Sequence, residues 1–160
     1  MAANGSVGQM IEVFTDGGCS GNPGPGGWAY HLTIDRRNGS AVEERENSGA
    51  VDHTTNNRME MTAVIEALME IQESWDYGSI RVVVSTDSTY VQQGISSWIH
   101  RWRRNHWKTA NGKPVKNADL WGCLDTLSTS IKAEFRWVRG HTGDQRNERC
   151  HQLVQEAIGR

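Results

Sequence analysis

Three acidic residues stand where a carboxylate is unusual, and the chemistry that they suggest is metal binding. Asp16 closes the apolar, β-branched run Ile11–Thr15, which predicts an interior strand. An ionised carboxylate inside a protein needs donors, a cation or a metal beside it, because desolvation without a partner costs several kcal/mol. The chain offers two further carboxylates that could share such a partner, Glu60 and Asp87. A shared metal cation is therefore expected.

Glu60 lies near the start of a predicted helix that runs from Thr54 to about Trp75. Thr54-Thr55-Asn56-Asn57 supplies N-cap chemistry, and an apolar stripe recurs at helical spacing: Met61, Val64, Ile65, Leu68, Ile71 and Trp75. At about 100° per residue, Glu60 falls at the edge of this stripe. A first-turn acid would also serve the helix dipole. An outward residue would serve the dipole equally, so the inward tilt favours a second buried carboxylate.

Asp87 follows the short β-branched run Ile80–Thr86, which predicts a parallel strand beside the first. One interpretation is that Asp87 caps a helix beginning at Ser88, because Asp is a favoured N-cap residue. That interpretation does not explain why two predicted central strands both end in Asp. Open α/β sheets place ligand sites at the carboxyl ends of their strands, which favours Asp87 as a third site residue.

The elements that must position these acids alternate between strand and helix patterns. The expected order is a strand to Asp16, a glycine-rich loop over 17–27, strands over 28–35 and 43–50 around a turn at 37–40, the helix over 54–75, the strand over 80–86, helical pieces over 90–105, a basic turn over 108–116, a helix over 119–130, a strand over 133–138 and a helix over 147–158. The glycine-rich loop matches neither GxxxxGK[ST] nor GxGxxG, which disfavours a nucleotide cofactor.

Composition indicates one globular domain. The 160 residues are 36% hydrophobic and 22% charged, enough for a sizeable core. We expect a single domain over residues 9–160 after a disordered tail, 1–8, that is neither a signal peptide nor a membrane anchor. Three distant cysteines suggest no disulfide framework or zinc site, and no run approaches the ~20 apolar residues of a membrane span. These features predict a cytoplasmic protein with reduced thiols.

Positive charge is concentrated in one block, although the net charge is −2. Residues 88–118 contain no Asp or Glu but hold six cations and three tryptophans: Arg101, Arg103, Arg104, Lys108, Lys113, Lys116, Trp98, Trp102 and Trp107. A solvated basic helix is one interpretation. The tryptophans weigh against it, because exposed indoles are costly unless they pack on sugar rings, bases or a neighbouring helix.

His141 lies between Gly140 and Gly143 and should therefore occupy a mobile loop. A lone histidine on a loop is usually a surface residue. Near a carboxylate cluster, however, an imidazole could carry protons at neutral pH.

Together these residues resemble a known family. The motifs are Phe14-Thr15-Asp16-Gly17-Gly18, Gly21-Asn22-Pro23-Gly24-Pro25-Gly26-Gly27, Thr55-Asn56-Asn57-Arg58-Met59-Glu60, Ser85-Thr86-Asp87-Ser88, Trp98-Ile99-His100, Trp107-Lys108-Thr109, Lys113-Pro114-Val115-Lys116-Asn117, Asp119-Leu120-Trp121, Val138-Arg139-Gly140-His141 and Asn147-Glu148-Arg149-Cys150. In this order, from about residue 10 to 158, the chain resembles bacterial type 1 ribonuclease H. The resemblance implies an α/β fold with a mixed five-stranded sheet, order 3-2-1-4-5, and flanking helices. It also implies an endonuclease that cuts the RNA strand of RNA/DNA hybrids and leaves 5′-phosphate and 3′-hydroxyl ends.

The resemblance assigns the catalytic roles. Asp16, Glu60 and Asp87 correspond to metal-binding carboxylates, with Asp16 bridging two Mg²⁺ ions about 4 Å apart, and His141 corresponds to the loop histidine that assists proton movement or product departure. At the position of a usual fourth metal-site Asp, this chain has His151. His151 is either a surface residue or a ligand to an ion or its water shell. We favour the ligand, for which Mn²⁺ is the better metal, although Glu148, one turn earlier, could also touch the water shell of the metal.

The resemblance further implies how the hybrid is held. The backbone around Gly17 and Cys19, with Asn22 and Asn56, would read the 2′-hydroxyls of the RNA sugars, while Thr55 and Asn117 would hold a DNA phosphate. Residues 98–117 correspond to a basic protrusion that grips the DNA strand; its contacts would be Trp98, Trp102, Arg103, Arg104, Trp107 and Lys108. The expected partner is an RNA/DNA hybrid, bound by a monomer without a membrane.

Two other classes remain open. A hybrid-binding module would keep the tryptophans and cations but would not need three carboxylates together. An integrase or junction resolvase could use the same scaffold, and the basic protrusion argues against it.

Overall fold

The computed structural model describes residues 9–35, 43–140 and 144–159. Its sheet contains β1 (Met10–Cys19), β2 (Gly24–Ile34), β3 (Glu43–Thr54), β4 (Arg81–Thr86) and β5 (Glu134–Trp137), in the order β3-β2-β1-β4-β5. β1, β2 and β3 are antiparallel neighbours, and β4 and β5 run parallel to β1. The mixed sheet and its strand order confirm the expectation from the sequence. The predicted tail over 1–8 and turn over 37–40 lie outside the described residues.

The glycine-rich segment is mostly strand, so the loop predicted over 17–27 was too long. Gly17, Gly18 and Cys19 still pair with β2, and only the short stretch before Gly24 turns. Glycine serves close approach here rather than turning: a Cβ on Gly17 would lie 2.3 Å from the Met59 carbonyl carbon of the adjacent helix. A residue with a side chain at position 17 would force that helix away from the strand.

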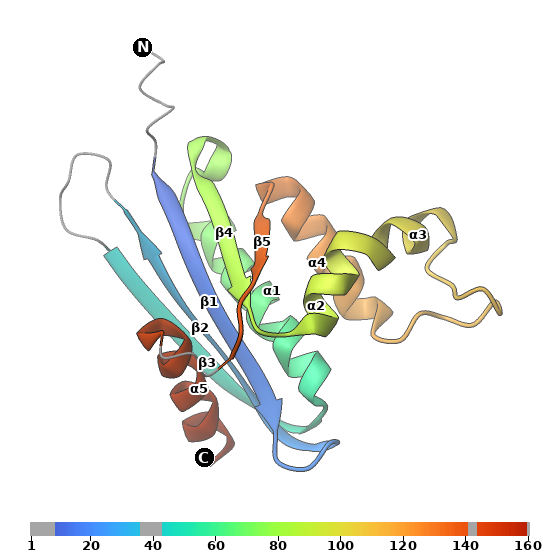
Figure 1. Cartoon of the computed structure of the whole chain (residues 1–160), viewed down its shortest axis with the longest axis horizontal. Coiled ribbons are helices and arrows are strands. Elements are labelled where there is room, and N and C mark those ends of the chain that lie inside the picture. The colour runs from blue at the N-terminus through green and yellow to red at the C-terminus, as the bar shows by residue number, and fades with distance from the viewer. Residues whose placement is uncertain (1–8, 36–42, 141–143, 160) are drawn as a thin grey trace.

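The helices lie on both faces of the sheet (Figure 1). They are α1 (Asn56–Ser74), α2 (Thr89–Gln93), α3 (Ile99–Arg104), α4 (Ala118–Ile131) and α5 (Gln145–Ile158), with a 3-10 turn at Tyr77–Ser79 and a π-helical turn at Gly94–Trp98 between α2 and α3. None of the helices in the described part of the chain combines the length and apolar character that a membrane span requires.

Alternating side chains of the central strands build two separate cores. Ile11 and Val13 of β1 pack with α1 and α4 in the larger core, whereas Phe14 packs with α5 residues such as Cys150 and Val154 in the smaller one. The period of two along a strand explains this division. The sheet therefore holds α1 and α5 on opposite faces of the same central strand, β1.

Candidate active site

Three carboxylates from three elements converge at the carboxyl ends of β1 and β4. One oxygen each from Asp16, Glu60 and Asp87 can be chosen so that all lie within 4.8 Å of one another. The parallel register pairs Phe14 with Ser85, so Asp16 and Asp87 both lie two residues beyond that pair on neighbouring strands. The sheet topology thus brings Asp16 and Asp87, which are far apart in the sequence, to the same end of two neighbouring strands.

Glu60 points into the interior. It is 8% exposed, and its Oε1 accepts a 2.6 Å hydrogen bond from the backbone N–H of Gly17. α1 begins at Asn56, with Thr55 as its N-cap, so Glu60 is the fifth residue of the helix and lies beyond the first turn, where the dipole acts most strongly. The inward orientation, and not the helix dipole, accounts for its position.

Asp87 does not cap α2. The hydroxyl of Ser88 is the N-cap and accepts the Val91 N–H at 3.1 Å, which leaves the Asp87 carboxylate for the cluster. Two further contacts fix Asp87: the Trp137 indole N–H donates to its backbone carbonyl at 3.1 Å, and the Cα of Gly140 approaches so closely that a Cβ there would lie 2.7 Å from Asp87 Oδ2.

The three acids repel one another in a partly dry setting. Burial, followed by the charge of Asp87, raises the pKa of Asp16 above its usual 3.8. Burial and the charges of Asp16 and Asp87 raise the pKa of Glu60 well above its usual 4.5. A divalent cation would relieve this repulsion, and an all-carboxylate oxygen donor set is the kind that Mg²⁺ prefers. The donors therefore fit the predicted metal.

His151 also reaches this cluster, from α5 on the other face of the sheet. Its Nδ1 lies 3.2 Å from Asp16 Oδ2, and its side chain is 44% exposed. The ring is therefore positioned beside a predicted metal ligand while remaining open to solvent. The second predicted histidine, His141, lies outside the described residues.

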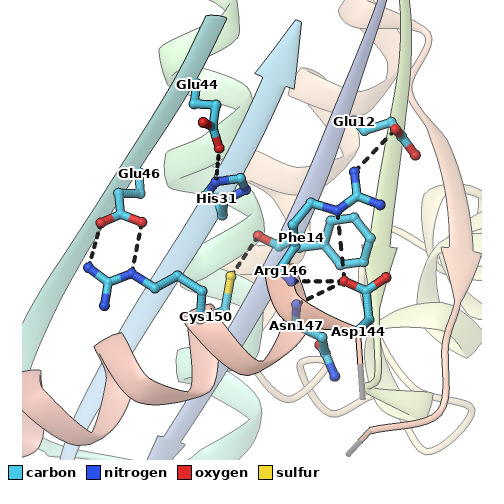
Figure 2. A network of polar contacts seen from close by, with 10 residues as sticks. Glu12, Phe14, His31, Glu44, Glu46, Asp144, Arg146, Asn147 and Cys150 are labelled. Carbon is cyan, nitrogen blue, oxygen red and sulfur yellow. Dashed lines mark hydrogen bonds and ion pairs between the residues drawn. The ribbon is translucent and has the colours of Figure 1, made fainter. Parts of the chain in front are cut away.

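Several side-chain contacts anchor α5 to the sheet (Figure 2). Asp144 caps the helix, which begins at Gln145, two residues before the predicted start. The Arg146 guanidinium lies 4.2 Å from the Phe14 ring centroid and 3.2 Å from Glu12 Oε1. The buried Cys150 thiol donates to the Phe14 carbonyl at 3.2 Å. These contacts fix α5 to β1 through the residues that precede His151, whose ring lies beside Asp16.

The predicted RNA-contacting residues form a small network beside the carboxylates. Asn56 Oδ1 accepts the Cys19 N–H at 2.9 Å, and Asn22 Oδ1 accepts the Asn56 N–H at 3.1 Å. An open cavity of about 330 Å³ connects this region to the acids; it is lined by Asp16, Gly17, Asn56, Asn57, Glu60, Asp87, Ser88, Thr89 and Tyr90. The two predicted phosphate-binding residues, Thr55 and Asn117, are linked through Arg58, which bonds Asn117 Oδ1 at 3.1 Å.

The basic block, residues 98–117, extends away from the sheet. Its α3 and the segment after it project from the body (Figure 1). Its tryptophans are half-buried: the Trp102 ring centroid lies 5.8 Å from that of Trp98, 6.3 Å from that of Trp107 and 5.4 Å from that of Trp121 in α4. Packing on a neighbouring helix thus accounts for part of the indole surface. An open groove of about 410 Å³ remains, lined by Trp98, Arg101, Trp102, Asn105, Lys108, Thr109 and Ala110.

Three residues that shape the site were not identified as functional from the sequence. Trp137 holds the Asp87 backbone, Arg58 links α1 to Asn117, and Asp125 of α4 accepts both Nε and Nη2 of Arg103. Arg58 lies inside a motif that carries the family resemblance, so a signal for it existed. No local pattern identifies the partners of Trp137 or Arg103, because those contacts join distant parts of the chain.

Comparison with known proteins places this geometry among its relatives. The RNase H family model matches residues 8–159. Ribonuclease H of Treponema denticola is 54% identical, with 92% of this chain and 96% of the relative covered, and ribonuclease H of Nitrobacter hamburgensis is 48% identical, with 97% and 95% covered.

Solved structures agree with the family match. The crystal structure of LC9-RNase H1, described as a type 1 RNase H with the type 2 active-site motif, is similar with a TM-score of 0.84 and 34% identity, covering 94% of this chain and 72% of the other. LC11-RNase H1, crystallised in complex with an RNA/DNA hybrid, is similar with a TM-score of 0.67 and 26% identity, covering 93% and 96%.

Proposed function

The chain belongs to the RNase H family, and from this premise we propose that it is an endonuclease that hydrolyses the RNA strand of RNA/DNA hybrids in a reaction that uses two Mg²⁺ ions. The observation that carries the proposal is the convergence of Asp16, Glu60 and Asp87 at one end of the open cavity. The proposed products carry 5′-phosphate and 3′-hydroxyl ends.

Asp16, Glu60 and Asp87 would hold the metal ions through their carboxylate oxygens. When bound, the metal would activate a water and stabilise the departing 3′-oxygen. The protein prepares this site: the Gly17 N–H orients Glu60, and the Trp137 indole holds the Asp87 backbone. Because the fold itself supplies these two supports, little reorganisation is needed at the moment of reaction.

Substrate selection follows from the surfaces around the acids. We propose that Gly17, Cys19, Asn22 and Asn56 contact the RNA sugars, since the minor groove of a hybrid exposes 2′-hydroxyl groups that distinguish RNA from DNA. Thr55 and Asn117 would bind a DNA phosphate. The basic block would hold the DNA strand through contacts from Trp98, Trp102, Arg103, Arg104, Trp107 and Lys108, with little base preference because backbone contacts carry little sequence information.

One panel of substrates tests the proposal. Matched RNA/DNA, RNA/RNA and DNA/DNA duplexes are incubated with the protein and Mg²⁺, Mn²⁺ or a chelator, and product ends are mapped. We expect cleavage of the RNA strand in the RNA/DNA duplex alone, abolished by the chelator. Binding without cleavage would indicate a hybrid-binding module, and cleavage of DNA/DNA would indicate a nuclease of the integrase or resolvase type; either result contradicts the proposal.

His151 is proposed to ligate one ion or its water shell, which its 3.2 Å contact with Asp16 supports. Imidazole suits Mn²⁺ better than Mg²⁺, which prefers oxygen. The ratio of Mn²⁺-supported to Mg²⁺-supported cleavage should therefore be larger for the protein as it stands than for His151→Asp. His151→Ala controls for loss of the ring alone. An unchanged ratio in His151→Asp would identify His151 as a surface residue.

His141 is proposed to assist proton movement or product departure, in keeping with its position in the family resemblance. Its replacement by alanine should lower the rate of cleavage under Mg²⁺ while leaving hybrid binding intact. A loss of binding equal to the loss of rate would contradict this role.

A further inference from the structure

The side-chain amide of Asn117 is bonded at both ends. Asn117 adopts a left-handed conformation (φ 61°) immediately before α4. Its Oδ1 accepts a hydrogen bond from Arg58 Nη1 at 3.1 Å, and its Nδ2 donates to the Tyr90 hydroxyl at 3.1 Å. The amide therefore joins α1 to α2 from a position at the start of α4.

The chemistry of these partners permits only one amide orientation. A guanidinium has donors and no acceptor, so only the amide oxygen can face Arg58. The Tyr90 hydroxyl also accepts the Trp121 indole N–H at 3.1 Å, and its two lone pairs accommodate both donors. A flipped amide would place its NH₂ group against the guanidinium, donor against donor, and would lose the bond to Arg58.

Arg58 is itself held in place. Its Nη1 and Nη2 donate to the two carboxylate oxygens of Asp119 at 3.1 and 2.7 Å, a bidentate geometry that fixes the plane of the guanidinium. Tyr90 is held by ring contacts, with its ring centroid 5.7 Å from that of Trp98 and 5.3 Å from that of Trp121. Tyr90 also lines the cavity that contains the carboxylates. Both neighbours of the amide are therefore rigid.

We propose that Arg58 and Tyr90 are positioning residues that preset Asn117 as a hydrogen-bond donor to a phosphate of the DNA strand. This inference rests on the proposed function, in which Asn117 is a phosphate contact. Phosphate oxygens only accept hydrogen bonds, so an amide that presented its oxygen would repel them. With Oδ1 committed to Arg58 and one N–H to Tyr90, the remaining N–H of the amide is the donor offered to the ligand. Because the amide orientation is already fixed, binding does not have to include the free-energy cost of ordering the Asn117 side chain.

A double-mutant cycle on hybrid cleavage tests the inference. Tyr90→Phe removes the acceptor of the Asn117 amide but keeps the aromatic ring and the net charge of the protein. We expect KM for the hybrid to rise about fivefold, the effect of one hydrogen bond, with kcat nearly constant. Arg58→Met should raise KM at least as much. In an Asn117→Ala background, both substitutions should lose most of their effect on KM, because the group that they orient is absent.

Several outcomes would overturn the inference while leaving the proposed hydrolysis of the hybrid intact. One is an equal rise in KM whether or not the background carries Asn117→Ala, which indicates a general electrostatic or structural effect. Another is a folded Tyr90→Phe variant with unchanged KM, and a third is an Asn117→Ala variant that binds hybrid normally. Thermal melts of every variant establish folding. If the unaltered protein fails to cleave the hybrid, the proposed function itself fails.

Discussion

The carboxylate cluster and the basic block use charge in opposite ways. Asp16, Glu60 and Asp87 bring like charges together where water is scarce, and the pKa values of Asp16 and Glu60 rise in response. The block spreads its cations along an exposed helix and turn, and half-buried tryptophans provide its rigidity. Repulsion in the cluster acts between partly buried groups and is screened little by salt, whereas attraction from the exposed cations of the block is screened by salt.

The difference teaches where each region is vulnerable. The cluster trades stability for a site that binds a divalent cation, so a neutral substitution there should stabilise the fold and abolish activity. The block distributes its attraction for phosphates over several cations, so loss of one cation should weaken hybrid binding only modestly.

Asp16→Asn should lower the rate of hybrid cleavage at least about a thousandfold, because transition-state charge stabilisation by a metal is worth several kcal/mol. In chelator, the same variant should resist urea better by on the order of 1 kcal/mol, because one of three repelling charges is gone. Glu73→Gln, at an exposed position of α1, is the matched control and should change neither quantity. Cleavage by Asp16→Asn at the normal rate would remove the cluster from the mechanism.

Glu60→Gln should flatten the pH dependence of stability in the absence of metal. The pKa of Glu60 is raised in the folded state, so above its unfolded value of about 4.5 the folded state binds more protons than the unfolded state. The free energy of unfolding should therefore fall as pH rises from that value through the raised pKa, and then level off. Urea unfolding in chelator at a series of pH values measures this slope. If the unaltered protein and Glu60→Gln gave parallel curves of unfolding free energy against pH, the charge of Glu60 would not destabilise the fold.

The smallest effects should separate two adjacent arginines of the block. Arg103 is paired with Asp125, whereas Arg104 forms no ion pair within the described residues. Arg104→Ala should reduce the slope of log K against log salt for hybrid binding by about one. Arg103→Ala should change that slope less and cost at most ~1 kcal/mol of stability, because the pair is partly exposed. Equal changes in slope would show that Asp125 does not withhold Arg103 from the substrate.

The glycine-rich segment illustrates the limit of local interpretation. Gly17 and Gly18 predicted a loop because glycine is frequent in turns, yet both lie in β1. The close approach of Met59 to Gly17 comes from the packing of α1, which begins 39 residues later in the chain, at Asn56. A pattern search over neighbouring residues contains no information about that contact. Likewise, the cap of α2 proved to be Ser88, since both Asp87 and Ser88 have the right chemistry and only the backbone course selects between them.

The sequence by itself determined which residues could form the site and which elements carry them, because strand alternation, helical periodicity and capping are short-range properties. Asp16, Glu60 and Asp87 could each be recognised as acids at the edge of an apolar pattern. Only the tertiary structure decided how close their oxygens lie, that Asp125 neutralises Arg103, and that Arg58 and Tyr90 orient the Asn117 amide. Those contacts span 22 to 71 residues, and their geometry depends on the packing of whole elements against one another.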